Sequence, residues 1–472
     1  MKNKKILSVI LALSMMVMSA NTADAFWKKT SKKQKTQTVQ SVSVNESYTN
    51  DVHSVFTLND CIAIAIKHNP SIQASFYNED VYKSKIGQAW ANYFPAISAD
   101  VQVSRSGNHY NKEIPPYYRK SVYNTMGYVP SVSADMLLFD FGKTKATADM
   151  AKRQYESKKE STKENINTII YDIKYTYYNI LFAQAQVQVY EDTVNDYELQ
   201  LSQAWGFYKY GTKPKLDVVT AEYNLGNAKL NLLKAKNVLE VAYVELSRIM
   251  GIPEYTNYEL SDQMTLKKYN VTVDESIEKA MEVRPELLAA KKNVDAAKMN
   301  LRAIRRDIAP DIGIFGSYSN GLGNEYNVQS SQFGVGLNYS GLNLARLKKQ
   351  IDEAKAFYNM SKAQYEDVKH DVYFNVKKNY LELETAREAI VIAKLALDEA
   401  KEQYRQVTGR YKAGVGDAIE LKDGENTYLN ARLDFYNSVL NYNTTAASLE
   451  KEIGVPLVFS DELILKITPE DL

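Results

Sequence analysis

Across 472 residues the chain sets 58 Lys and Arg side chains against 57 Asp and Glu, so it lacks the basic excess that nucleic-acid binding normally requires. Its single cysteine, Cys61, excludes an internal disulfide framework. After the first 25 residues no run of 18 consecutive apolar residues occurs, which excludes a conventional transmembrane helix.

Residues 1–25 have the layout of a secretory signal peptide. Three lysines precede an apolar run at residues 6–17, and a small-x-small cleavage site ends at Ala25. Residues 26–55 are polar and rich in lysine, which predicts a flexible arm because so little apolar area could be buried. We therefore expect an exported protein whose ordered part begins near residue 56.

Residues 56–253 form the first copy of a repeated pattern. A helix that Thr57 could cap ends at Asn69-Pro70, and a second helix runs on toward Pro95. Apolar and polar residues then alternate over two segments, which predicts strands at about 96–106 and 129–139.

A long helix and a shorter returning helix complete this copy. Residues 143–205 contain no glycine or proline, and at 1.5 Å per residue they would form a helix about 95 Å long. No globular core is that deep, so this helix must pack along its length as in a coiled coil. It ends at a turn containing Gly211, from which the shorter helix returns to Gly251-Ile252-Pro253.

Residues 271–456 repeat the pattern after a linker at 254–270, and a tail at 457–472 follows. Strands are expected at about 311–319 and 332–340, and a long helix free of glycine and proline at 342–408. The turn at Gly414 lies 203 residues after Gly211, and the helix-ending Gly454-Val455-Pro456 lies 203 residues after its counterpart. The chain is therefore a tandem duplication.

Four strands per chain are too few to close a membrane-spanning barrel, because the smallest such barrels have about eight. An open sheet edge in lipid would leave backbone groups unpaired, so a membrane-inserted form of this chain must oligomerise. Insertion also requires the apolar residues of the strands to share one face: Ile97, Val101, Val103, Ile312, Ile314, Val335 and Leu337.

These features together resemble the TolC-like outer-membrane efflux protein family. The resemblance rests on the opening from Leu58 to Pro70, the strand starts at Pro95 and Pro310, the block Phe139 to Gly142 and the Tyr-x-x-Gly turns, in the same order twice. It implies a mainly α fold: a homotrimer with a 12-stranded transmembrane β-barrel, four strands from each chain, above a long α-helical coiled-coil tunnel.

The resemblance further implies an outer-membrane exit duct with a periplasmic extension, in a tripartite efflux or type I secretion system. An inner-membrane transporter would supply the energy, and a periplasmic adaptor protein would dock at the turns around Gly211 and Gly414.

The resemblance places the gate at residues near those turns. The family's gate tyrosine falls on Tyr411, its first-copy gate acid on Asp217, and its two constriction acids on Glu420 and Asp423. Acids three residues apart on a helix share a face, and rings of acids favour cations.

One family position departs from the pattern. The gate arginine falls on Gly416, which cannot form an ion pair, so Lys412 or Lys422 is expected to supply the positive charge instead.

Motifs for chemistry are absent from the sequence. The four histidines have no metal-ligand spacing with one another or with Cys61, and no nucleophile motif stands at a strand-to-helix turn. We expect no metal, no cofactor and no enzymatic activity. The alternative hypothesis is a soluble periplasmic or surface coiled-coil protein, an adaptor or adhesin, with its strands in a small globular head.

Overall fold

The computed structural model describes residues 54–106, 125–252, 258–261, 267–270, 272–322, 327–339, 343–457 and 459–463. The expected signal peptide and all but the last two residues of the expected arm lie outside these ranges. None of the helices in the described part of the chain is both long enough and apolar enough to cross a membrane.

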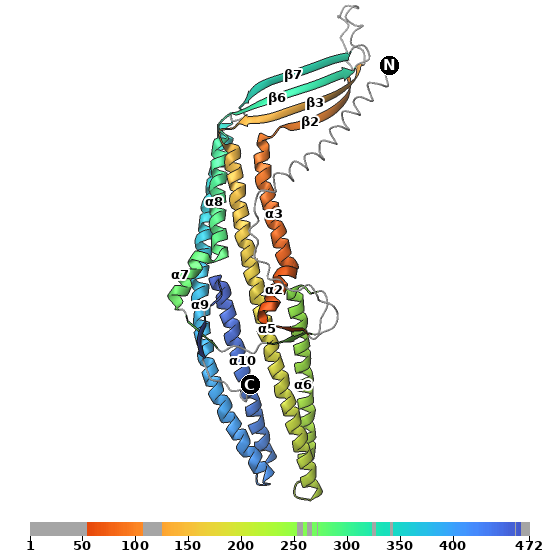
Figure 1. Cartoon of the computed structure of the whole chain (residues 1–472), viewed down its shortest axis with the longest axis vertical. Helices are drawn as coiled ribbons and strands as arrows, with labels where there is room; N and C mark the ends of the chain where they lie inside the picture. Colours follow the sequence, from red (N-terminus) through yellow and green to blue (C-terminus); the bar gives the residue numbers. More distant parts are fainter. Residues whose placement is uncertain are drawn as a thin grey trace, which may run out of the picture. The chain divides into compact units, whose positions relative to one another are not determined.

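Four long strands form one antiparallel sheet in the order β2-β3-β6-β7 (Figure 1). They span β2 (Ala96–Ser106), β3 (Thr125–Phe139), β6 (Asp311–Leu322) and β7 (Asn327–Asn338). Each repeat supplies one hairpin, and β3 pairs with β6 to join the two hairpins. The outer strands β2 and β7 each keep one edge without a partner among the described residues.

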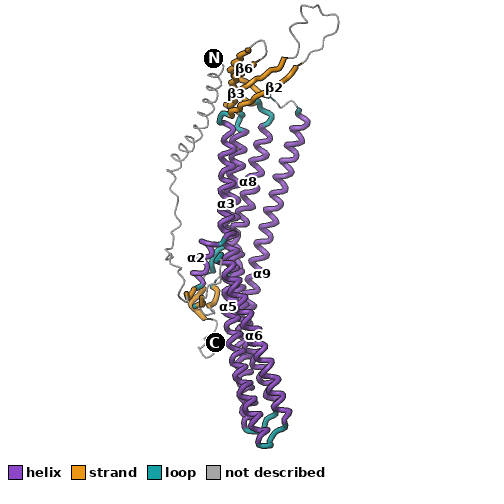
Figure 2. The backbone as a smooth tube through the Cα atoms, turned by 90° about the vertical axis from the view of Figure 1, so that its right-hand side faces the viewer, coloured by secondary structure: helices purple, strands orange, loops and turns teal. Residues whose placement is uncertain are grey.

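Strands β2 and β6 each follow a helix, and β3 and β7 each lead into one. Because neighbouring strands run in opposite directions, all four strands join their helices at the same edge of the sheet. The joining helices are α3 (Pro70–Trp90), α5 (Lys143–Lys209), α8 (Pro285–Arg306) and α9 (Leu344–Lys412). Two helices of 36 residues return from the far ends of α5 and α9: α6 (Lys215–Met250) and α10 (Ala418–Ile453). Figure 2 shows these helices and the loops that connect them. We call α5–α6 the first hairpin and α9–α10 the second hairpin.

Each hairpin has its own core, closed by a short helix near the middle of the long one. In the first repeat α2 (Leu58–His68) packs on α5 and α6, and Ile173, Tyr177 and Leu246 are fully buried there. In the second repeat α7 (Val273–Val283) packs on α9 and α10 around Leu383 and Phe435. The expected mainly α fold, duplicated as helix, strand pair, long helix and returning helix, is confirmed.

Equivalent caps start the short helices in the two repeats. The Thr57 hydroxyl accepts a hydrogen bond from the Asp60 backbone, and the Asp60 carboxylate accepts one from the Thr57 N–H. Thr272 and Glu275 form the same capping box before α7. Such a box satisfies two backbone donors that the first helical turn leaves unpaired, which is why both helices begin where they do.

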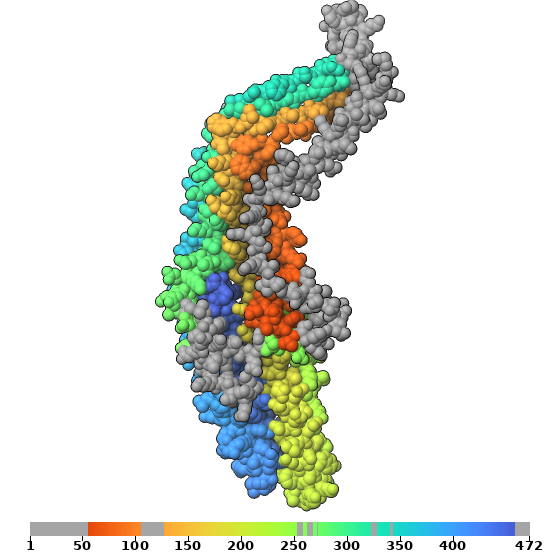
Figure 3. All heavy atoms as spheres, viewed as in Figure 1, coloured from red at the N-terminus to blue at the C-terminus, as the bar shows by residue number. Residues whose placement is uncertain are grey.

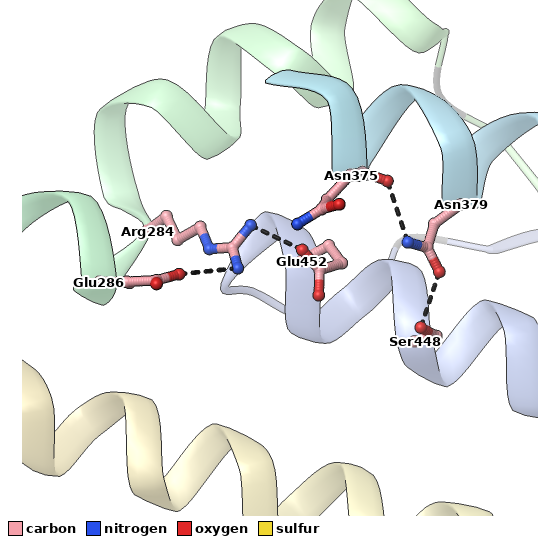
Figure 4. Close-up of polar contacts among 6 residues, drawn as sticks. All are labelled: Arg284, Glu286, Asn375, Asn379, Ser448 and Glu452. Atoms are coloured by element: carbon pink, nitrogen blue, oxygen red, sulfur yellow. Dashed lines mark hydrogen bonds and ion pairs between the residues drawn. The ribbon is translucent and has the colours of Figure 1, made fainter. Parts of the chain in front are cut away.

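The second helix of each repeat begins at a proline, and the residue before it reaches the end of the returning helix. Asn69 donates from its side chain to the carbonyl of Ile249 over 2.7 Å. The equivalent Arg284 donates to the Glu452 carboxylate over 2.6 Å and to Glu286 over 2.9 Å, as Figure 4 shows. The same joint is therefore closed by an amide in one copy and by ion pairs in the other.

The linker and the tail contain short strands that the sequence analysis did not predict. In the linker lie β4 (Tyr258–Leu260), parallel to β1 (Ser54–Phe56), and β5 (Lys267–Tyr269), antiparallel to β8 (Phe459–Leu463) of the tail. Strands of three to five residues are too short to produce a readable alternation, so only tertiary pairing reveals them.

The register of the sheet gathers apolar residues on one face. Met136 lies opposite Ile314, which lies opposite Val335, and Ile312 lies opposite Leu337. Directly opposite residues point to the same side, and side chains alternate along each strand. All seven apolar residues expected on one face share it, and the other face carries Ser98, Asp100, Ser133, Asp135 and Gln332.

Candidate functional site

The two hairpin turns are built alike, 203 residues apart. Gly211 and Gly414 adopt the left-handed conformation, with φ of 73° and 75°. In each turn the glycine N–H bonds the carbonyl three residues back, and the next N–H bonds the carbonyl five residues back. This pair of hydrogen bonds ends a helix and favours glycine at the left-handed position. Both turns are exposed, and no atom lies within 4 Å of a Cβ added at either glycine.

Apolar side chains are exposed close to both turns. They are Tyr210, Leu216 and Val219 in the first hairpin, and Val415 and Ile419 in the second. Exposed apolar groups that cluster in this way are typical of protein interaction sites.

Tyr411 is buried where the two hairpins meet, with 4% of its surface exposed. It packs with Val407 and Leu421, and its ring meets Phe207 of the first hairpin edge-to-face at 6.1 Å between centroids. Burial, followed by the negative charges of Asp217 and Asp417, raises the pKa of the Tyr411 hydroxyl. Figure 3 shows the ends of the two hairpins in contact.

Lys213, in the first turn, joins Tyr411 to Asp217. Its ammonium lies 4.0 Å from the centre of the Tyr411 ring and 5.4 Å from that of Phe207. The same nitrogen lies 3.8 Å from the Asp217 carboxylate. A cation over two aromatic rings is attracted by both, so Lys213 links the hairpins although the sequence analysis did not name it.

The two expected constriction acids differ in their surroundings. Glu420 forms an ion pair with Arg410 over 2.7 Å and is half-buried. Asp423, one turn further along α10, is exposed. The partners of Glu420 and Asp217 are therefore Arg410 and Lys213, rather than Lys412 or Lys422.

Gly416 has a structural reason to be glycine. A Cβ at this position would lie 2.8 Å from the Tyr411 backbone nitrogen and 3.0 Å from the Arg410 carbonyl carbon. The turn folds directly onto the end of α9, and the N–H groups of Val415 and Gly416 both bond the Arg410 carbonyl. This backbone path leaves no room for an arginine at position 416.

Above this turn the hairpins meet through a second group of polar residues, which are partly buried around the buried Glu425. Gln200 donates to Glu425 over 2.9 Å, Tyr404 donates to Asp196 over 3.1 Å, and Arg432 pairs with Asp192 over 2.9 Å. The sequence holds one signal for it, because Glu425 interrupts the apolar stripe that includes Leu421 and Tyr428. In the described part of the chain, no group of three or more His, Cys, Asp or Glu side chains could hold a metal ion.

A four-stranded sheet with one apolar face, continued by two long helical hairpins, is the fold of outer-membrane channel proteins of known structure. The model of the family described as "Outer membrane efflux protein" matches residues 61–252 and 276–455, one segment in each repeat. The chain belongs to this family and is an outer-membrane protein.

Individual relatives agree with the family assignment. The chain is 20% identical over 410 residues to a probable efflux pump outer membrane protein, TtgC of Pseudomonas putida, covering 84% of this chain and 82% of TtgC. It is 26% identical over 324 residues to the outer membrane protein TolC of Vibrio cholerae, covering 65% and 73%. The crystal structure of the CmeC outer membrane channel of Campylobacter jejuni superposes with a TM-score of 0.73 at 15% identity, covering 84% and 85%.

The family match decides between the two hypotheses from the sequence. The chain is an outer-membrane efflux protein and not a soluble adaptor or adhesin.

Proposed function

We propose that three copies of this chain close into a ring and form a passive exit duct across the outer membrane. Four strands from each copy would complete a 12-stranded barrel, and the helices would continue it as a tunnel into the periplasm. The chain would catalyse no reaction. An inner-membrane transporter would drive the cargo of an efflux or secretion system into the duct.

The observation that supports this proposal is that the sheet has strand edges without partners among the described residues and that two helices carry exposed apolar stripes, which a second copy could cover. Strands β2 and β7 each have one edge with no partner strand in the described ranges, and a strand edge facing lipid must be paired. The helices α6 and α9 carry exposed apolar residues at the a and d positions of heptads, the spacing of a coiled-coil seam. On α6 they are Leu216, Val219, Tyr223, Leu230, Leu233 and Val244; on α9 they are Phe357, Met360, Phe374, Leu381, Ile392 and Leu395.

The two seams lie on different helices, so one copy's α6 can pack on the next copy's α9. Such a head-to-tail contact generates a closed ring when repeating the rotation brings the last copy back onto the first, and an open filament when it does not. A groove of about 790 Å³ between α9 and α10, lined by Phe374, Leu381 and Asn441, lies along the α9 seam and would receive α6 side chains.

The two turns are the proposed docking points for a periplasmic adaptor protein. The exposed side chains of Tyr210, Leu216, Val415 and Ile419 support this assignment, because no other part of the described chain covers them. Gly211 and Gly414 would shape both turns for the same kind of partner.

The residues above the turns are the proposed gate. Tyr411 and Asp217, linked by Lys213, would hold the hairpins together, and their separation would open the tunnel. Three copies of Glu420 and Asp423 would form acidic rings at the narrow end and favour cations.

The assembly is tested by placing a charge in the α6 seam. In Leu233→Glu each copy would bury a carboxylate without a partner, which costs several kcal/mol, so we expect monomers in detergent. Val238 is similarly exposed in the single chain but lies outside the heptad seam, so Val238→Glu is the matched control. Light scattering with detergent correction should give three chains per particle for the wild type and the control. A monomeric wild type, or a trimeric Leu233→Glu, would contradict the proposed ring.

A further inference from the structure

A carboxyl group is buried between the two hairpins without a positive partner. Glu425, on α10, is 4% exposed, and its Oε2 accepts a hydrogen bond from Gln200 on α5. Tyr197, also on α5, bonds the same carboxyl group. The other oxygen of Glu425, Oε1, has no hydrogen-bond partner among the described residues. Burying a charged carboxylate with an unsatisfied oxygen costs far more free energy than burying the neutral carboxylic acid.

The charged and titratable groups around Glu425 do not offset this cost. The α5 face contributes Asp196, whose own pKa Asp192 raises, and α9 contributes Tyr404, which donates to Asp196. Two basic groups of this region act on the aspartates instead: Arg432 of α10 pairs with Asp192, and both Arg432 and Lys412 lower the pKa of Asp196. Within the described part of the chain, no Lys or Arg forms an ion pair with Glu425.

This environment raises the pKa of Glu425 into the neutral range. Burial, together with the negative charge of Asp196, raises the pKa of Glu425 to about 7, although the hydrogen bonds from Gln200 and Tyr197 oppose the shift. Burial also raises the pKa of Asp196. Because Gln200, Tyr197 and Asp196 all belong to the first hairpin, separating the hairpins would remove each of these contacts and admit water to the carboxyl group.

We propose that Glu425 is a proton-binding site that closes with the two hairpins, so that acid holds the helical end shut and its opening is favoured as the pH rises. This rests on the proposed duct, in which hairpin separation is the opening step. The ligand is the proton, and the element that responds to it is the contact between α10 and α5.

The direction and size of the effect follow from linkage. In the closed form the pKa of Glu425 is raised to about 7, whereas in the open form it approaches the ordinary glutamate value of 4.5. The bound proton therefore stabilises the closed form fully below pH 4.5, and this stabilisation is lost as the pH rises through about 7. Between pH 6 and pH 8 the ratio of open to closed hairpins should rise about tenfold per chain. Below pH 6 the ratio continues to fall until the carboxyl group of the open form is also protonated.

Hairpin separation can be measured directly in the full mature chain. Nitroxide labels would be placed on cysteines at the exposed positions Tyr210 and Ala413, in a Cys61→Ala background, and their separation measured by double electron–electron resonance from pH 5.5 to 8.5. In the wild type the longer-distance population should grow with a midpoint near pH 7. Glu425→Gln mimics the protonated side chain and should keep the short distance at every pH. Asp434→Asn, which neutralises an exposed carboxylate on the same helix, should titrate as the wild type does.

If Glu425→Gln fails to assemble, a second variant tests the same proposal. Asp196→Asn removes a negative charge that raises the Glu425 pKa, so it should move the midpoint to lower pH. A pH-independent wild type, a Glu425→Gln protein that titrates normally, or an unmoved midpoint in Asp196→Asn would overturn the proposal. Conductance across lipid bilayers separates the two ideas. If the label distances change with pH but the protein conducts no current, the duct alone is refuted. If the protein conducts but the label distances do not change with pH, the proton site alone is refuted.

Discussion

Replacing Lys213 with methionine should loosen the closed gate. The substitution removes the ammonium group from between Tyr411, Phe207 and Asp217 but keeps a side chain of similar length. In the closed arrangement the ammonium is largely shielded, because the Lys213 side chain is 17% exposed and the Asp217 side chain 19%. A shielded cation–π contact is worth about 1–2 kcal/mol. The ion pair to Asp217 lies within the first hairpin and does not itself link the two hairpins.

A loss of about 1–2 kcal/mol corresponds to a roughly 5- to 30-fold shift of the open-to-closed ratio for each chain. Single-channel recordings of purified protein in planar bilayers should therefore show a larger fraction of time in the high-conductance state. Lys215→Met removes a charge from an exposed side chain two residues away and is the matched control. If the Lys213→Met and Lys215→Met proteins open equally often, Lys213 does not hold the gate.

Two further predictions concern the Arg284 ion pair and the acids Glu420 and Asp423. Arg284→Ala leaves the Glu452 carboxylate, whose side chain is 15% exposed, without its partner, and should lower the free energy of unfolding by about 3–5 kcal/mol in denaturant titrations. Arg248→Ala, which breaks an exposed pair, should cost no more than about 1 kcal/mol, and equal losses would contradict this account. Neutralising Glu420 and Asp423 together, as Gln and Asn, should reduce cation selectivity in reversal-potential measurements, whereas unchanged selectivity would place both residues outside the pore.

The repeated architecture could be read from the sequence because each element carries its own local signal. Thr57 and Pro70 mark the start of helices, alternation marks the strands, and Gly211 and Gly414 mark the ends of the long helices. The duplication strengthens every such signal, since an interpretation made in one copy can be checked in the other. The apolar face of the sheet followed from the same alternation.

The contacts between hairpins could not be predicted in this way. Gln200 and Glu425 are 225 residues apart, and nothing near either residue specifies the other. Lys213 and Arg410 were missed for a related reason: their partners depend on how the turns fold and not on helical spacing. The glycine at 416 suggested a missing ion pair, but the sequence alone did not show that the backbone of Tyr411 occupies the space an arginine would need.

The joint shown in Figure 4 has a consequence for how the two copies tolerate mutation. Asn69 bonds a backbone carbonyl, which every amino acid provides, so the residue at position 249 can change without breaking the bond. Arg284 bonds the side chain of Glu452, so a change at position 284 alone leaves the Glu452 carboxylate uncompensated, and a change at position 452 alone leaves Arg284 with only the more exposed Glu286. Duplication thus produced one joint whose bond survives a change of side chain at position 249 and one whose ion pair depends on two side chains. Because Ile249 is buried in the core of the first hairpin, a library of random variants should contain functional changes there to other apolar residues, without a change at position 69, and changes at position 452 mainly together with changes at position 284.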